Sequence, residues 1–259
     1  MDSLTVSIVS HGHGPLLCRL LHDLAAVAGL APVQLIVTLN LADEPFDASA
    51  FAPLRVKVLR NTRPQGFGAN HNAAFQHCST AWFAVLNPDL RLPSNPFPAL
   101  FEAAARCPDV VLWAPHVVGP NGMSEDAVRP NLTPASLVAR RLLGHREPLR
   151  VDRPARNGEP FYWLAGMFML LRSSVFRTVG GFDERFFMYC EDYDLCARLY
   201  VAGHGLAVEP RARVVHDAQR DSHRSTTHLL WHLASLVKVW TSATFWYITT
   251  GLRPNPTKT

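Results

Sequence analysis

Charged side chains are scarce in this sequence: Asp, Glu, Lys and Arg together make up 18% of its 259 residues. The formal net charge of +4 is correspondingly small, which excludes the strongly basic footprint of a nucleic-acid-binding protein. Hydrophobic residues make up 48%, enough to fill the core of one large domain or of two closely packed halves. The composition predicts a globular protein whose partners are not nucleic acids.

Paired cysteines and long apolar runs are also missing. The five cysteines form no Cys-x-x-Cys pair, and their scatter through apolar segments favours reduced, buried thiols in a cytoplasmic protein. No export signal is visible, because Asp2 and His11 interrupt the N-terminal stretch. The longest hydrophobic region, 229–250, is broken by His232 and Lys238, so a membrane-spanning helix is not expected.

The C-terminal segment 226–259 is predicted to be helical, and two interpretations of it stay open. Its aromatic residues are of the kind that favour a lipid headgroup interface: Trp231, Trp240, Phe245, Trp246 and Tyr247. The segment either lies peripherally on the inner face of the cytoplasmic membrane or packs as a helix against the rest of the protein.

A Gly-x-Gly-x-x-Gly loop does not follow the first predicted strand, which disfavours a dinucleotide cofactor. Strands instead alternate with helices, at residues 4–10 (strand), 16–28 (helix), 33–39 (strand), 56–59 (strand), 68–77 (helix) and 82–86 (strand). This alternation predicts an α/β fold with a mainly parallel central sheet. Ligands in such sheets bind beyond the carboxyl ends of the strands, where Ser10, Asn40, Asn61 and Asp89 would converge.

The second half of the sequence is less regular. A helix is predicted at 93–106, a strand at 110–115, an apolar run at 161–171 and helices at 173–179 and from about 191. Between them, residues 119–160 contain many prolines and glycines together with Arg140, Arg141, Arg146, Arg150, Arg153 and Arg156, which indicates a long excursion. That excursion is either solvated surface or a contact for an acceptor or a membrane phosphate.

Three carboxylates, Glu191, Asp192 and Asp194, follow an aromatic stretch at the predicted start of the last helix. Acidic residues in a first helical turn complement the helix dipole, which is one sufficient explanation. Glu191 and Asp194 are three residues apart and can cap the helix, which leaves Asp192 to point elsewhere. Burial raises the proton affinity of a carboxylate, so Asp192 is a candidate general base.

Several motifs occur here in a characteristic order: residues 6–10, 66–72, 86–89, 163–166, 181–184, Glu191-Asp192 and His216. With these motifs the chain resembles the inverting glycosyltransferases of family 2, particularly bacterial rhamnosyltransferase-like members. The resemblance implies a GT-A-like (nucleotide-diphospho-sugar transferase), Rossmann-like fold with helices flanking the sheet. Residues 1–225 would form one catalytic domain, with a nucleotide-sugar-binding half at 1–115 and an acceptor and catalytic half at 116–225.

The same resemblance assigns the site. Asp192 matches the catalytic base and Glu191 a residue that orients or caps, while Trp163 and Gly166 match the acceptor side. Asp89, within Asn87-Pro88-Asp89, and His216 would hold Mg²⁺ or Mn²⁺ at the diphosphate, whose hard oxygen ligands suit these ions. The residues implied for nucleotide-sugar binding are Ser10, Asn40, Asn61, Gly66, Asn72, Asn87, Asp89 and Arg224.

Two departures from the family pattern bear on the donor. Leu39 stands where a carboxylate usually contacts the base, and Asn87 replaces the first Asp of an Asp-x-Asp motif. By resemblance the donor is dTDP-rhamnose, and the acceptor is a glycan of a bacterial surface polysaccharide, such as an O-antigen of the cell envelope, or a lipid-linked oligosaccharide.

Other functions are weighed against this one. A degenerate member that binds a nucleotide sugar or glycan without turnover is the main alternative, because carboxylates are missing at positions 39 and 87. A sugar-phosphate nucleotidyltransferase would need a basic Gly-rich loop after the first strand, which residues 10–15 do not supply. A zinc site at His223, His228 and His232 is disfavoured, because no catalytic Glu or paired Cys accompanies them.

Overall fold

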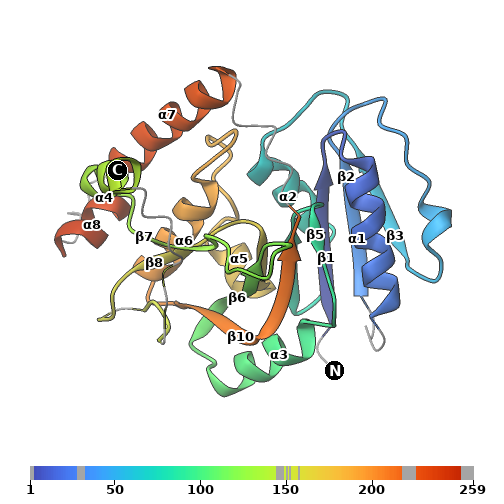
Figure 1. Ribbon diagram of the computed structural model, residues 1–259, viewed down its shortest axis with the longest axis horizontal. Helices are drawn as coiled ribbons and strands as arrows, with labels where there is room; N and C mark the ends of the chain where they lie inside the picture. Colours follow the sequence, from blue (N-terminus) through green and yellow to red (C-terminus); the bar gives the residue numbers. More distant parts are fainter. Residues whose placement is uncertain are drawn as a thin grey trace.

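The structure, a computed structural model, describes residues 3–27, 33–143, 149, 151, 153–156, 158–217 and 226–251, without the side chains of 139–143. Its centre is an eight-stranded sheet in the order β3-β2-β1-β4-β9-β6-β10-β5, flanked by helices (Figure 1). The predicted α/β class is therefore confirmed.

The N-terminal half of the sheet is entirely parallel. Its strands are β1 (Leu4–Ser10), β2 (Val33–Leu39), β3 (Val56–Arg60) and β4 (Trp82–Leu86). Helices α1 (Gly14–Ala26) and α2 (Phe67–Phe75) and the short 3₁₀ helix η1 (Ala48–Phe51) connect them. Parallel pairing brings the carboxyl ends of β1, β2, β3 and β4 to one edge, as the sequence predicts.

The C-terminal half of the sheet is mixed. Strand β9 (Phe168–Arg172) runs antiparallel to both β4 and β6 (Val110–Val118), whereas β10 (Gly205–His216) is parallel to β6. The two-residue strand β5 (Leu90–Arg91) closes this side of the sheet against β10. Helices α3 (Phe97–Arg106), α5 (Ser173–Thr178) and α6 (Glu191–Val201) accompany these strands.

The apolar run predicted at 161–171 forms two strands rather than one. Strand β8 (Tyr162–Leu164) leaves the main sheet and pairs with β7 (Val128–Pro130), and a turn at residues 165–167 leads into β9. Strand β7 and helix α4 (Pro134–Leu143) lie within the segment expected to be irregular. The second, two-stranded sheet therefore belongs to the acceptor half of the predicted domain.

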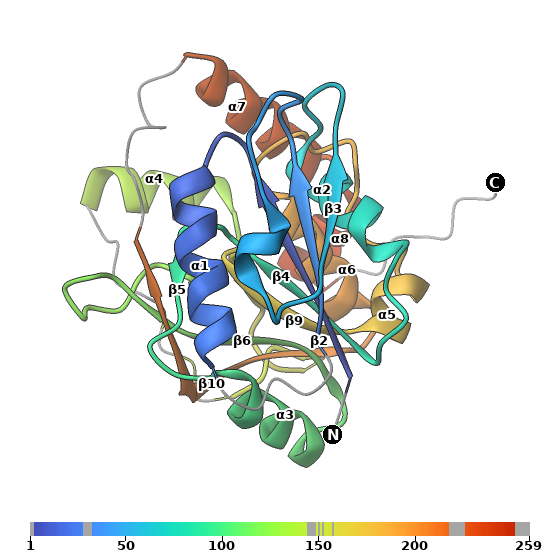
Figure 2. The same ribbon diagram turned by 90° about the vertical axis from the view of Figure 1, so that its right-hand side faces the viewer.

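Each face of the main sheet packs into its own hydrophobic cluster. On β4, Trp82, Ala84 and Leu86 join the cluster that includes α1 and α3, whereas Phe83 and Val85 join the cluster that includes α5 and α6. Figure 2 shows α1 and α5 on opposite sides of the sheet. This alternation explains why β4 is buried along its whole length.

The C-terminal helices α7 (Thr226–Trp240) and α8 (Ala243–Thr250) pack against the domain through Leu236, Val239 and Phe245. Among the described residues no helix is long and apolar enough to cross a membrane. All five cysteines are free, and Cys78, Cys190 and Cys196 are buried.

Two glycines at the start of α2, Gly66 and Gly68, allow this helix to approach the 182–187 loop closely. A Cβ atom on Gly66 would lie 2.6 Å from the carbonyl oxygen of Phe187, and one on Gly68 would lie 2.6 Å from Cβ of Phe182. Asn72 completes this contact, because its side chain donates to the Phe182 carbonyl (2.8 Å) and accepts from the Phe182 N–H (2.9 Å). The loop that leads into α6 is thus fixed onto α2.

Substituting Gly68 with alanine should destabilise the protein, because the added methyl group overlaps the Phe182 side chain. Overpacking of this kind costs about 1–3 kcal/mol, measurable by urea unfolding. Gly14→Ala is the matched control, since its added Cβ would meet nothing within 4 Å. Equal unfolding free energies for the two variants would contradict the described packing.

Candidate functional site

A network of asparagine side chains joins the carboxyl ends of β2 and β3. Asn61 donates to the side-chain oxygens of both Asn40 (2.8 Å) and Asn70 (2.6 Å). Asn40 also donates to the carbonyl of Gln65 (3.0 Å) and accepts from its N–H (2.8 Å). Of the residues predicted for the nucleotide, Asn40 and Asn61 are therefore adjacent, in a pre-ordered loop that also contains Gly66.

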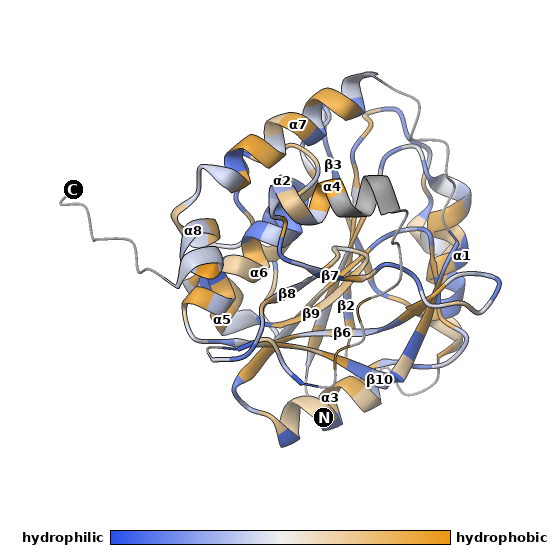
Figure 3. Cartoon of the chain, turned by 60° about the vertical axis from the view of Figure 1, so that its left-hand side comes forward, coloured by the Kyte–Doolittle hydropathy of each residue, from blue (hydrophilic) through white to orange (hydrophobic). Residues whose placement is uncertain are grey.

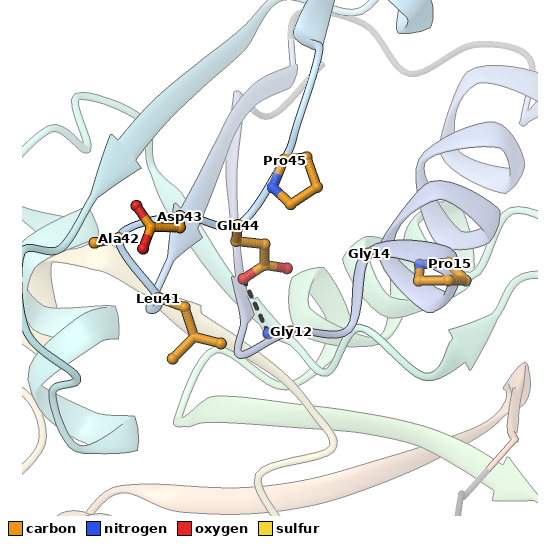
Figure 4. Close-up of a pocket in the computed structure, with 8 residues that line it drawn as sticks. All are labelled: Gly12, Gly14, Pro15, Leu41, Ala42, Asp43, Glu44 and Pro45. Carbon is orange, nitrogen blue, oxygen red and sulfur yellow. Dashed lines mark hydrogen bonds between the residues drawn. The ribbon is translucent and has the colours of Figure 1, made fainter.

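A pocket of about 550 Å³ lies beside this network, between the start of α1 and the segment after β2 (Figure 4). Its lining includes Gly12, Leu41, Asp43 and Glu44. The buried Glu44 carboxylate accepts hydrogen bonds from the Ser10 hydroxyl and from the Gly12 N–H (3.0 Å). Sequence reasoning missed Glu44, although it is a carboxylate only five residues beyond the Leu39 position where one was expected.

Asp89 and His216 form an ion pair where β5 meets the end of β10. Nε2 of His216 lies 3.1 Å from Oδ2 of Asp89, and His216 pairs with Leu90 in the sheet. Burial lowers the pKa of His216, but the hydrogen bond and charge of Asp89 outweigh it and raise the pKa overall. The structure therefore places the two suggested metal ligands side by side.

The Asp89 segment is linked to Asp192 through the turn between β8 and β9. The N–H of Asn87 donates to the carbonyl of Met167 (2.9 Å), and the N–H of the neighbouring Gly166 donates to Oδ2 of Asp192 (2.9 Å). A Cβ on Gly166 would lie 3.3 Å or less from the Phe67 ring and 3.7 Å from Cβ of Asp192. Residues about one hundred positions apart therefore meet at one turn.

Asp192 combines partial exposure with a perturbed carboxyl group. Its two oxygens accept from the N–H groups of Gly166 and Tyr193 (2.8 Å), which fix the rotamer. Burial raises the pKa of Asp192, and these N–H groups together with the charge of Arg129 offset the increase only in part. Such a carboxyl group is suited to accepting a proton from a bound hydroxyl.

Glu191 is buried beside Asp192, and its Oε2 atom has no hydrogen-bond partner. Burial, followed by the negative charge of Asp192, raises the pKa of Glu191 well above its usual value. Tyr189 and Cys190, just before it, both have left-handed backbone angles (φ 72° and 66°), an uncommon conformation for residues other than glycine. This strained turn determines where the acidic pair enters α6.

Asp194, the third carboxylate, has a structural role. It binds Arg198 (2.7 Å), which also donates to the carbonyls of Val179 and Gly181 (2.7 Å each). This arrangement fixes the α5–α6 connection. The three carboxylates thus differ in their contacts, and only Asp192 both retains solvent exposure and faces the turn at Gly166.

Arg129 is a residue of the site that sequence reasoning missed. It pairs with Trp163 in the β7–β8 ribbon, and its guanidinium carbon lies 5.0 Å from the centre of the Trp163 ring. Trp163 itself is only 3% exposed and donates to the carbonyl of Pro130 (3.0 Å). The indole therefore supports Arg129 in the structure, while its predicted contact with an acceptor stays a prediction.

Helix α7 contributes two histidines to the same region. The His232 ring packs edge-on against Tyr189 (5.3 Å between ring centres), and His228 forms a hydrogen bond with the Tyr189 hydroxyl (2.8 Å). Burial, then the charge of Arg129, lowers the pKa of His232, and the charge of Asp192 opposes this. The helix that the sequence left as a membrane or packing element therefore borders the acidic pair.

Asp89 and His216 are the residues that the sequence suggested as ligands of a divalent cation. Oδ1 of Asp89 and Nδ1 of His216 are buried and have no hydrogen-bond partner, which leaves donor atoms available there. Mg²⁺ in nucleotide sites takes one or two protein carboxylates and completes its shell with phosphates and water, so this sparse set fits. Within the described part of the chain, no three His, Cys, Asp or Glu side chains form a metal-binding group.

Some predicted residues fall elsewhere. Asn72 lies in the clamp on Phe182 and also donates to Glu184 (3.0 Å). Gly66 packs against the 182–187 loop, so the close backbone approach predicted for it is made there by the protein itself. Arg224, together with Ser222 and His223, lies outside the described residues.

The chain is similar in sequence to two named rhamnosyltransferases. The N-acetylglucosaminyl-diphospho-decaprenol L-rhamnosyltransferase of Mycobacterium tuberculosis is 31% identical over 253 residues, covering 89% of this chain and 81% of the relative. Rhamnosyltransferase WbbL of Escherichia coli is 47% identical over 74 residues, 28% of each chain.

Solved structures give the fold. GalNAc-T7, crystallised with UDP, GalNAc and Mn²⁺, superposes with a TM-score of 0.63 at 16% identity, covering 85% of this chain and 44% of that one. The predicted GT-A fold is therefore confirmed, and structures of this fold have been solved with a divalent cation. Residues 2–236 match the family described as "Glycosyltransferase like family 2". The chain therefore belongs to glycosyltransferase-like family 2 and is a glycosyltransferase.

Proposed function

We propose that the protein transfers rhamnose, with inversion, from dTDP-rhamnose to a sugar hydroxyl of a lipid-linked acceptor in bacterial surface polysaccharide synthesis. The likeness to the mycobacterial rhamnosyltransferase, whose name specifies rhamnose and a diphospho-decaprenol acceptor, supports the transferred sugar and the class of acceptor. The observation that carries the proposal is the pair of hydrogen bonds from Asn87 to Met167 and from Gly166 to Asp192, which connects a donor-side strand end to a candidate base.

Asp192 acts as the general base in this proposal. The acceptor hydroxyl gives its proton to the Asp192 carboxylate, and its oxygen forms a bond to the anomeric carbon from the face opposite the diphosphate. The bond from that carbon to the diphosphate oxygen breaks, and its electron pair leaves with dTDP. The Gly166 and Tyr193 N–H groups each bind one oxygen of the carboxylate and so hold the Asp192 side chain in one rotamer.

Asp89 and His216 would hold the divalent cation, which supplies positive charge to the departing diphosphate. The pocket beside Asn40 would take the nucleotide, because it lies at the carboxyl ends of β1 and β2. Glu44 orders this pocket by binding Ser10 and Gly12, so Ser10 acts on the loop rather than through a free hydroxyl.

Asp192→Asn should lower kcat by at least about 10²-fold while leaving the melting temperature near that of the parent protein, because the amide accepts no proton. In the parent enzyme kcat/KM should fall as the pH drops through the raised pKa of Asp192, and this limb should vanish from the residual rate of the variant. The measurement is rhamnosyl transfer from dTDP-rhamnose to lipid-linked N-acetylglucosamine.

Glu102→Gln removes an exposed carboxylate on α3 and serves as the control, with no expected change in rate. Near-parental transfer by Asp192→Asn would refute the base assignment. Donor binding without any transfer or donor hydrolysis by the parent protein would instead favour the binding-only alternative, which the substitutions at positions 39 and 87 suggest.

Asp89→Asn should abolish the Mn²⁺-dependent part of the thermal stabilisation by dTDP-rhamnose, because it removes a charged ligand from the proposed cation site. A ligand that binds only the folded state raises the melting temperature, and the increase grows with the logarithm of its concentration relative to its Kd. Melting curves with donor alone and with donor plus Mn²⁺ separate the two contributions. An unchanged Mn²⁺ increment in the variant would exclude Asp89 as a metal ligand.

Residues 226–251 are proposed to contact the membrane surface that holds the acceptor. Along α7, which Figure 3 colours by hydropathy, four large apolar side chains are at least half exposed: Leu229, Leu230, Leu233 and Val237. The opposite face of α7 borders the acidic pair through His228 and His232. A lipid surface on the apolar face would therefore place the carrier next to the site.

The double variant Leu230→Glu, Leu233→Glu should reduce co-flotation with anionic phospholipid vesicles by at least tenfold. Burying each leucine in the lipid contributes about 1.5–3 kcal/mol to binding, and this contribution is lost when a charged glutamate replaces the leucine. Met123→Glu is the control, because Met123 is 68% exposed in the turn after β6. Absence of vesicle binding by the parent protein, or undiminished binding by the double variant, would exclude the contact.

A further inference from the structure

Arg129 forms no ion pair with Asp192 among the described residues, and it does not line the pocket beside Asn40. It lies on β7, whose pairing with β8 continues through a hydrogen bond from Ala165 to the carbonyl of Ala127 (2.8 Å). The next residue, Gly166, binds the Asp192 carboxylate. The ribbon thus fixes the backbone of Arg129 relative to the candidate base.

The Arg129 side chain is oriented by contacts on two sides. Its Nε donates to the carbonyl of Asp126 (2.9 Å) and lies 3.1 Å from an Asp126 carboxylate oxygen, while the guanidinium plane lies over Trp163. The indole is held in turn by Pro130 and by edge-on packing with Tyr193 (5.9 Å between ring centres). Stacking and a fixed Nε pre-organise the guanidinium for binding.

Its two terminal nitrogens remain available. Neither Nη atom has a hydrogen-bond partner among the described residues, although the side chain is only 29% exposed. Arg129 acts electrostatically on Asp192 and on His232, yet no ion pair between Arg129 and Asp192 exists within the described part of the chain. The guanidinium nitrogens of Arg129 and the carboxylate oxygens of Asp192 therefore lie more than 4.0 Å apart, and His232 of α7 is close enough to both for each charge to act on it.

A paired terminal guanidinium edge of this kind matches two oxygens of a phosphate. An acceptor sugar whose hydroxyl meets Asp192 extends away from the donor toward its own reducing end. In a diphosphate-linked acceptor, that end bears the phosphate. Helix α7, which contacts Tyr189 through His228 and His232, offers exposed leucines to a lipid tail.

Resting on the proposed function, we propose that Arg129 is an acceptor-specificity residue, whose terminal nitrogens bind the phosphate that links the acceptor sugar to its lipid. The Trp163 ring then serves as the support of this cation. Because Arg129 binds this phosphate, the enzyme selects charged, lipid-diphosphate acceptors over neutral glycosides.

The test compares two acceptors that share one sugar: N-acetylglucosamine linked through diphosphate to a ten-carbon prenyl chain, and the uncharged decyl glycoside. Arg129→Ala should raise KM for the diphosphate acceptor by about 10–100-fold, since a hydrogen bond to a charged group contributes about 1.5–3 kcal/mol. KM for the glycoside, and KM for the donor, should stay within about twofold. Arg129→Lys should show a smaller rise in KM than Arg129→Ala, because lysine keeps the positive charge but lacks the paired terminal N–H donors of the guanidinium.

Arg153→Ala is the matched control, since Arg153 is 78% exposed and pairs with Glu159. Equal losses on both acceptors would overturn the proposal, because they would assign Arg129 to positioning Asp192 or the sugar. No loss on either would overturn it as well.

A binding measurement separates this proposal from the proposed function. With dTDP and Mn²⁺ filling the donor site, calorimetric titration of geranyl diphosphate should show binding by the parent protein and by Arg153→Ala. Binding should be lost in Arg129→Ala, whose melting temperature serves as the folding control. Undiminished binding by Arg129→Ala, or none by the parent protein, would refute the phosphate subsite even if rhamnosyl transfer were demonstrated.

Discussion

The hydrogen bond from the Gly166 N–H to Asp192 is the contact on which the site depends. It lies at the turn between β8 and β9, and the adjacent Met167 binds the backbone of Asn87 at the end of β4. One short turn therefore sets both the orientation of the candidate base and its relation to the donor-side strand. Gly166 fits between Phe67 and Asp192 because it lacks a side chain.

The buried charges around α6 are arranged so that their effects differ. Asp194 is neutralised by Arg198 at 2.7 Å, Glu191 has an oxygen without a partner, and Asp192 accepts two backbone hydrogen bonds. Desolvation raises the pKa of all three carboxyl groups, yet only Asp192 belongs to a residue that is partly exposed rather than buried. Differences in environment thus assign separate roles to neighbouring residues of one chemical type.

The N-terminal half of the fold was predictable because its strands are short apolar, β-branched runs. The predicted bounds of β1, β2 and β4 coincide with those observed, and β3 differs by one residue. The apolar run at 161–171 gave no sign that it divides, because both of its strands are buried and their alternation is hidden. The antiparallel direction of β9 follows from that division.

The residues of the candidate site that belong to a sequence motif could be predicted. The residues that only strand pairing or a loop brings to the site could not. Asn40 and Asn61 follow strands β2 and β3, so their adjacency could be inferred from the topology of parallel sheets, whereas Asp89 and His216 were suggested as partners by the family resemblance. Arg129 lies on a three-residue strand that ends in proline, within an arginine-rich segment, and only its register with Trp163 distinguishes it. Glu44 was missed because a loop, not a strand end, carries it to Ser10.

The shared strand β9 has a mechanical consequence. Because β9 pairs with β4 on one side and with β6 on the other, the main sheet continues without a break from its parallel N-terminal half into its mixed C-terminal half. A hinge motion between the two halves would have to break the hydrogen bonds of β9 with β4 or β6, so the two halves of the sheet move as one rigid body. Substrates must then enter, and products leave, through motions at the edge of the sheet rather than through the opening of two lobes.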